Sequence, residues 1–295
     1  MTMRICLALF FIFVASQLGC QIELQEEASR WELVVLGVAQ DGGMPHLGCQ
    51  NPPCSHVRTG NGVPERVSCL GLVHHPTGQV YLFDATPDFP AQFHSLSKKK
   101  QPDGIFLTHA HIGHYTGLMY LGKETLGAKN VPVYATDRMG KFLSSNGPWD
   151  LLVKDQRIQL NPLVPDKPLF LAADLSVTPI EVPHRDEYSD TVGYLIKGPN
   201  RSAVFIPDID RWEKWNRDIR ELANSVDLLF LDGTFGSPDE LPGRDLSNIP
   251  HPFMSDTRKK LEGSSGKLWF IHLNHSNPSM GRDKDVVRQG MRFDL

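Results

Sequence analysis

From residue 31 onward, short apolar runs alternate with turns rich in Gly and Pro. Runs of about 4 to 8 apolar residues bounded by such turns are typical of β-strands buried in a sheet. The pattern therefore predicts a series of strands along the chain. Their predicted ranges are 32–37, 67–73, 79–84, 104–107, 131–134, 175–180, 191–196, 202–206, 228–231 and 267–271.

Two segments carry apolar residues at helical spacing instead. Residues 118–126 and 212–223 are predicted to form helices, and the second is charged on its other face. Many strands with few helices favour two β-sheets packed face to face with helices on the outside. Since no internal repeat and no long linker divides residues 31–295, we expect them to form one domain.

The first thirty residues follow a different pattern. A short basic start at 1–4 precedes an apolar run at 5–15 that is too short to span a bilayer comfortably. We interpret residues 1–20 as a signal peptide and residues 21–30 as a polar tether. The end of the signal resembles a bacterial lipobox, which predicts a lipoprotein anchored at Cys20, with simple secretion as the alternative. The protein is then expected to be exported, either periplasmic or held on a membrane by this lipid anchor.

Composition narrows the class of partner. The chain has 295 residues, of which 40% are hydrophobic and 22% charged, as in an ordinary globular protein with a large core. Its net charge of −4 gives no sign of a surface for nucleic acid. We expect a small-molecule substrate, and the sequence leaves the oligomeric state open.

Candidate chemistry is concentrated directly after the predicted strand at 104–107. His109 and His111 are two residues apart, so both rings point to one side if the strand continues, and His114 follows one turn later. A histidine-rich surface loop is the alternative interpretation. Because neutral imidazole is the commonest protein ligand for zinc and similar ions, three histidines at this spacing favour a metal site.

Residues able to bind metal also follow three later predicted strands: His184, Asp208 and His272. Taken singly, His184 is typical of a turn and Asp208 of a helix cap. Strand ends, however, bring side chains from distant parts of a sequence to one edge of a sheet. The recurrence therefore predicts one composite metal site.

Residues 109–114 resemble the HxHxDH signature of the metallo-β-lactamase fold, with Gly113 at the position of the aspartate. The resemblance implies an α/β protein, specifically an αββα sandwich of two mixed β-sheets with helices on the outer faces. It also implies two metal ions, and the missing carboxylate affects the second of them. We expect Asp41 or a water molecule to take its place.

By position, the resemblance assigns the remaining ligands. The first ion is expected to bind His109, His111 and His184, and the second His114 and His272, with Asp208 bridging. Asp210 is the alternative to Asp208. Asp84 resembles an aspartate of the superfamily that supports ligands from behind.

The glycine-rich segment 39–54 resembles the opening of the pyrroloquinoline-quinone biosynthesis protein B family, whose relatives include a cyclic phosphodiesterase. The resemblance implies a second, structural metal bound by Cys49, Cys54 and His275. One family cysteine is replaced by Asn51, so His46 or His56 is expected as the fourth ligand. A disulfide between Cys49 and Cys54 is the alternative, and Cys69 is expected in the core.

Two further residues receive roles from the resemblance. His251 is expected to contact phosphate or to protonate a leaving group, and Asp232 either to orient a histidine or to cap the turn before Gly233. The predicted activity is hydrolysis of a small ester or phosphodiester by a metal-bound hydroxide, with Asp208 positioning the nucleophile. Zinc is the expected ion, and iron or manganese are alternatives. The competing hypotheses are an iron-dependent oxygenase related to quinone-cofactor biosynthesis and a non-catalytic metal-binding protein.

Overall fold

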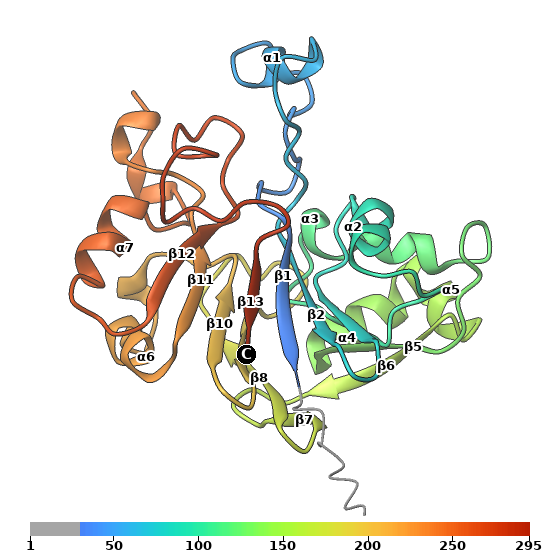
Figure 1. The fold of residues 1–295 in the computed structure, drawn as a ribbon. Helices are drawn as coiled ribbons and strands as arrows, with labels where there is room; N and C mark the ends of the chain where they lie inside the picture. Colours follow the sequence, from blue (N-terminus) through green and yellow to red (C-terminus); the bar gives the residue numbers. More distant parts are fainter. Residues whose placement is uncertain (1–29) are drawn as a thin grey trace, which may run out of the picture.

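The computed structural model describes residues 30–295 and contains two β-sheets packed against each other (Figure 1). The first sheet has the strand order β13-β1-β2-β3-β4-β5-β6 and the second β12-β11-β10-β9-β8-β7. The strands of the first sheet are β1 (Trp31–Gly37), β2 (Cys69–His74), β3 (Gln79–Phe83), β4 (Gly104–Phe106), β5 (Val131–Thr136), β6 (Ile158–Leu163) and β13 (Arg292–Asp294). Those of the second are β7 (Leu169–Ala172), β8 (Leu175–Glu181), β9 (Val192–Lys197), β10 (Ser202–Ile206), β11 (Leu228–Asp232) and β12 (Lys267–Ile271).

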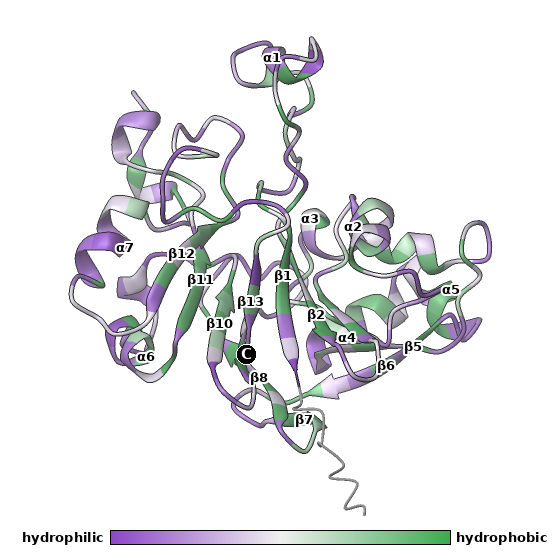
Figure 2. Ribbon diagram, in the orientation of Figure 1, coloured by the Kyte–Doolittle hydropathy of each residue, from purple (hydrophilic) through white to green (hydrophobic). Residues whose placement is uncertain are grey.

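The central strands are apolar along their whole length because both of their faces are buried. Along β10, Ala203 and Phe205 point into the core between the sheets, while Val204 and Ile206 point into the core beneath the helices. This alternation follows the two-residue period of a strand. Figure 2 shows the same concentration of hydrophobic residues on β10 and β11. The layer between the sheets therefore forms the main core.

Helices cover the outer face of each sheet (Figure 1). The first sheet is covered by α2, α4 and α5, and the second by α6 and α7. The α-helices are α1 (Cys54–Arg58), α2 (Phe89–Leu96), α3 (Ile112–Tyr115), α4 (Asp137–Ser145), α5 (Trp149–Lys154), α6 (Ile219–Ser225) and α7 (Met254–Lys260). The 3₁₀ helices are η1 (Thr116–Leu121), η2 (Trp212–Lys214), η3 (Pro238–Glu240) and η4 (Leu246–Asn248). This layering confirms the predicted αββα sandwich.

Both predicted helices are wrong in extent. The segment 118–126 contains only the end of η1, whose last residue is Leu121. The segment 212–223 is divided into η2 and α6, because the chain extends at Trp215, whose indole nitrogen donates to the backbone oxygen of Glu181 over 2.9 Å. Tertiary anchoring of this kind overrides the helical spacing of the sequence.

The strands missed by the sequence pattern lie at or near the sheet edges. These are β6, β7 and β13, which contain half-buried or exposed positions and so lack a continuous apolar run. Residues 42–66, which include α1, form an arm that projects from the body (Figure 1). Among residues 30–295, no helix is both long enough and apolar enough to cross a bilayer.

Strand direction determines where the predicted ligands meet. Strands β1, β3 and β4 run the same way in the first sheet, and β8, β10, β11 and β12 do so in the second. Each of these strands ends with a candidate site residue or is followed by one. The two edges are joined by a hydrogen bond from the Val192 nitrogen to the Thr108 oxygen over 3.1 Å. The site thus lies where the carboxyl ends of both sets of strands meet.

Candidate metal centre

The first group of candidate ligands is made of three histidines. His109 and His111 follow β4, and His184 follows β8, and their ligand atoms lie within 4.8 Å of one another. The Nε2 atom of His109 is 2.8 Å from Nδ1 of His111. The side chains of His109 and His184 are each 1% exposed. The structure therefore brings together the three residues expected at the first ion.

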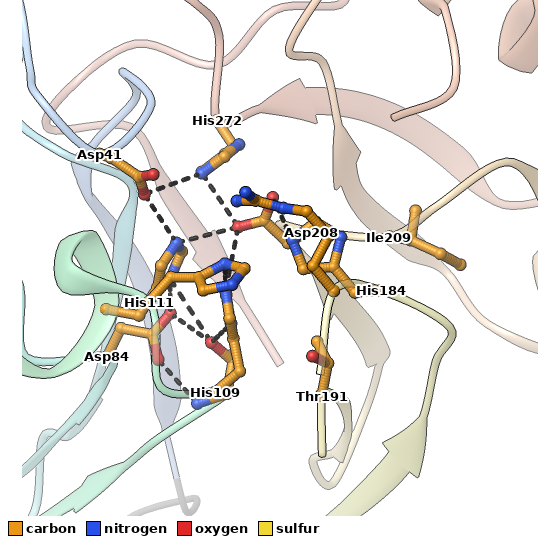
Figure 3. A network of polar contacts seen from close by, with 12 residues as sticks. Asp41, Asp84, His109, His111, His184, Thr191, Asp208, Ile209 and His272 are labelled. Atoms are coloured by element: carbon orange, nitrogen blue, oxygen red, sulfur yellow. Dashed lines mark hydrogen bonds and ion pairs between the residues drawn. The ribbon is translucent and has the colours of Figure 1, made fainter. Parts of the chain in front are cut away.

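The second group contains Asp41, His114, Asp208 and His272. The Oδ2 atom of Asp208 lies 2.9 Å from Nε2 of His114 and 3.0 Å from Nε2 of His272. Oδ1 of Asp41 is 3.2 Å from the same nitrogen of His114. Figure 3 shows Asp41, Asp208 and His272 pointing toward one another.

Asp208 lies between the two groups. Its Oδ1 is 3.7 Å from Nε2 of His184, while its Oδ2 is 3.8 Å from Nε2 of His109. The residue is 3% exposed and follows β10. Asp210 does not share this position, because its carboxylate contacts the Lys214 ammonium over 2.6 Å. A bridging role thus suits Asp208, and the alternative Asp210 is directed elsewhere.

Several buried polar atoms of the two groups have no hydrogen-bond partner among the described residues. They are Oδ1 of Asp41, both ring nitrogens of His184, and Nε2 of His114 and of His272. Leaving such atoms unpaired costs about 1 to 3 kcal/mol each unless another partner is present. Imidazole nitrogens and carboxylate oxygens are the donors that zinc and related ions take. The donor set therefore fits metal ions.

The two groups differ in charge when no metal is bound. Burial lowers the pKa of His109 and that of His184, the latter to about 4. Burial also acts to lower the pKa of His272, but the carboxylates of Asp208 and Asp41 outweigh it and raise that pKa to about 10. The pKa of His114 is raised in the same way by its three carboxylate neighbours. At neutral pH, His184 is thus neutral and His272 is protonated, and the pKa values of His109 and His114 are shifted in the same respective directions.

Two outer contacts orient these ligands. Asp84 is buried and lies 2.7 Å from Nδ1 of His114, as expected of an aspartate that supports a ligand from behind. Glu187, which the sequence did not single out, places Oε2 2.9 Å from Nε2 of His111. Its side chain is 49% exposed and belongs to a loop with no apolar pattern, so no sequence signal marked it.

His251 and Asp232 form a buried pair beside the centre. Nδ1 of His251 is 2.8 Å from Oδ2 of Asp232 and 3.5 Å from Oδ1 of Asp208. Asp232 also accepts a hydrogen bond from the Thr234 nitrogen over 2.9 Å. Its contacts are compatible with both interpretations left open by the sequence, orienting a histidine and capping a turn. Burial acts to lower the pKa of His251, but Asp232 raises it overall.

A third group joins two residues of the arm to one residue that follows β12. The ligand atoms of Cys49, Cys54 and His275 lie within 4.8 Å of one another, and Sγ of Cys54 is 3.4 Å from Nδ1 of His275. Both cysteines are free, so the alternative disulfide is not formed. The ring of His46 stacks on that of His275 with centroids 4.3 Å apart, whereas His56 is exposed on α1. Cys69 is buried in the core, away from this group.

Comparison with known proteins agrees with this fold. The chain is 23% identical to a coenzyme PQQ synthesis protein B from Methylobacterium sp. (strain 4-46), over 87% of this chain and 94% of that protein. The crystal structure of Zn²⁺-bound PqqB from Methylobacterium extorquens matches 90% of this chain and all of its own, with a TM-score of 0.76 and 21% identity. A diphosphatase from the PhnP family matches with a TM-score of 0.67 and 22% identity, over 90% of this chain and 97% of its own.

The predicted signal peptide at 1–20 and the predicted lipid anchor at Cys20 are not supported. These residues lie outside the described range of 30–295, as does the tether apart from Arg30. The names of the matching proteins describe cofactor synthesis and diphosphate hydrolysis, and none indicates a lipoprotein. A lipoprotein signal therefore has no support and is no part of the function proposed below.

The family itself is identified by a direct match. The model of the beta-lactamase superfamily domain matches residues 79–272, which contain every candidate ligand of the first and second groups except Asp41. Together with the layered fold, this confirms the resemblance seen in residues 109–114. The chain belongs to the β-lactamase superfamily.

Proposed function

We propose that this chain is a metal-dependent hydrolase whose substrate is a small phosphodiester. Its family and fold support a hydrolase in general terms. The observation that carries the proposal is the convergence of imidazole nitrogens from both groups of ligands on the buried carboxylate of Asp208. Zinc is the expected ion, since the donors are nitrogen and oxygen and the similar PqqB structure is zinc-bound.

A divalent ion bound here supplies a hydroxide at neutral pH, because it lowers the pKa of a bound water to about 7. The chain's own residues decide where that chemistry takes place. Asp208 contacts both groups of histidines and so fixes their separation. The lowered pKa values of His109 and His184 favour the neutral imidazole that a metal ion binds, and Asp84 keeps Nε2 of His114 directed inward.

His251 supports a phosphodiester as the substrate. Cleavage of a phosphodiester expels an alkoxide, which needs a proton when it leaves. The pair with Asp232 raises the pKa of His251 and holds Nδ1, which leaves the other ring nitrogen to face a substrate. The similar diphosphatase supports hydrolysis at phosphorus in general, since its name describes cleavage of a P–O bond. A carboxylic ester is the alternative substrate of the same groups.

The test is hydrolysis of bis-p-nitrophenyl phosphate by the full chain after metal removal and reloading with Zn²⁺ or Mn²⁺. We expect turnover, and His111→Ala should lower kcat by more than the roughly 100-fold caused by loss of an outer-shell partner. His94→Ala, on the exposed face of α2, is the matched control and should keep full activity. Phosphodiesterase activity that survives in His111→Ala overturns the proposal.

A second candidate is a role in quinone-cofactor synthesis, which the names of the curated relatives favour. An oxidative version of that role needs iron and oxygen. Metal analysis of protein purified without added metal separates the two, because zinc favours hydrolysis, while iron with oxygen consumption favours oxidation. Tight metal binding without cleavage of phosphodiesters, p-nitrophenyl acetate or simple lactones indicates a non-catalytic member of the fold.

A further inference from the structure

The side chain of Asp41 fills the space that a side chain at position 113 would need. Gly113 is buried in α3, and a Cβ atom added to it lies 2.2 Å from Oδ1 of Asp41 and 2.7 Å from its Cα. Real Cβ atoms essentially never approach other atoms this closely. No side chain fits at 113 while the loop of Asp41 keeps its position.

The backbone of the loop that carries this carboxylate is held on both sides. The backbone of Gln40 donates to Leu273 over 2.8 Å, and the nitrogen of Ser68 donates to Ala39 over 2.8 Å. Gly43 closes the turn with a hydrogen bond to Gln40 over 2.8 Å. The loop after β1 is therefore tied to the ends of β2 and β12, which restricts where the side chain of Asp41 can lie.

The same carboxylate faces the second group of ligands. Its Oδ1 lies 3.2 Å from Nε2 of His114 and 3.7 Å from Nε2 of His272, and it has no hydrogen-bond partner among the described residues. The side chain is 30% exposed, in contrast to 3% for Asp208. It thus forms the solvent-facing side of the group.

We propose that Asp41 and Gly113 are an exchanged pair, in which Asp41 supplies from the first loop the carboxylate that the HxHxDH signature has at position 113. The second ion then keeps a full set of ligands: Asp41, His114, Asp208 and His272. This inference rests on the proposed metal centre and names one of its ligands. It explains why the departure from the signature is a glycine, since Gly113 leaves the space that Asp41 occupies.

The test compares metal binding in four proteins: the parent, Asp41→Asn, Gly113→Asp, and the double variant with Asp41→Gly and Gly113→Asp. Metal equivalents are counted by elemental analysis, and Zn²⁺ affinity is measured by competition with a chelator. Asp41→Asn keeps the shape of the side chain and removes its charge. We expect this variant to bind one of the metal ions at least tenfold more weakly than the parent does.

The exchange itself is tested by rescue. Gly113→Asp alone is expected to lower the melting temperature and to lower the affinity for the same metal ion, because two carboxylates compete for one space. The double variant is expected to recover both the melting temperature and the affinity. The inference is overturned if Asp41→Asn binds metal as the parent does, or if the double variant is no better than Gly113→Asp.

These outcomes are independent of turnover. If the parent binds the second equivalent and the rescue succeeds but no phosphodiester is cleaved, the proposed function fails and the exchanged pair stands. If cleavage occurs but Asp41→Asn leaves every equivalent unchanged, the exchanged pair fails and the proposed function stands.

Discussion

The carboxylate of Asp84 lies 2.7 Å from Nδ1 of His114, and both side chains are fully buried. The same carboxylate accepts a hydrogen bond from the backbone nitrogen of Thr108 over 2.8 Å. Asp84 adopts a φ of 72°, in the left-handed region that Asp and Asn tolerate better than most residues. One residue at the end of β3 thus connects the following strand to a ligand of the second group.

Asp84→Asn should therefore separate charge from backbone conformation. Asn tolerates the left-handed φ, but its neutral amide lacks the negative charge that a carboxylate places beside Nδ1 of His114. We expect the affinity for the second Zn²⁺ to fall about 10- to 100-fold, the range measured for outer-shell partners. Asp166→Asn is the control, since Asp166 also has a positive φ (64°) but is exposed and lies opposite Arg217. Equal Zn²⁺ binding by the two variants, measured by chelator competition, contradicts this role of Asp84.

The role of His251 can be tested through the leaving group. If His251 donates a proton, His251→Ala should slow phosphodiesters with alkyl leaving groups by about 10²- to 10⁴-fold. Bis-p-nitrophenyl phosphate should be affected far less, because p-nitrophenolate leaves without a proton. The measurement is kcat for the two substrate types. Equal losses on both show that His251 does not protonate the leaving group.

Metal binding should release protons at neutral pH. In the metal-free protein, Asp208 and Asp41 keep His272 protonated up to a pKa of about 10 and raise the pKa of His114 as well. A divalent ion needs neutral imidazole, so binding at this group displaces these protons and its apparent affinity falls as the pH is lowered. Titration calorimetry in two buffers with different ionisation enthalpies measures the number released. The His272→Ala variant should release fewer protons when it binds metal. An unchanged number of released protons would argue against His272 as a ligand.

The cysteine group should influence the second ion. Asp41 lies at the start of the arm that carries Cys49 and Cys54, and His275 follows His272 by three residues. A metal bound to this group would tie both ligand-bearing segments together. We expect Cys54→Ser to lose one metal equivalent and to weaken binding at the second catalytic position. Cys69→Ala, a change in the core, is the control, and identical metal content in the two variants would show that the cysteines bind no metal.

Packing behind the histidine cluster should tolerate no side chain at Gly117. A Cβ atom there lies 2.1 Å from the backbone oxygen of Thr86 and 2.7 Å from Cβ of Phe89. We expect Gly117→Ala to lower the free energy of unfolding by about 1 to 3 kcal/mol. Gly140→Ala in α4 has its nearest neighbour at 4.0 Å and should be neutral or stabilise by up to about 1 kcal/mol. Chemical denaturation measures both, and equal stabilities would contradict the packing argument.

Much of the fold could be predicted from hydrophobic pattern. Buried strands such as β10 and β11 are marked by continuous apolar runs, because both of their faces are covered. The helix predicted at 212–223 failed, since two buried tryptophans, Trp212 and Trp215, hold that segment in a conformation set by distant partners. Edge strands such as β13 failed because half-exposed positions carry little apolar signal.

The sequence by itself determined which residue types are available for chemistry and that they follow strand ends, as His109, His184 and Asp208 do. The type of each residue and its place after a strand can both be read from the order of residues along the chain. Only the tertiary structure decided which carboxylate meets which histidine. The contact of Asp41 with His114 and the closeness of Asp41 to Gly113 join segments about 70 residues apart. Such contacts depend on how two sheets pack and where their loops are tied, and local pattern carries no information on either.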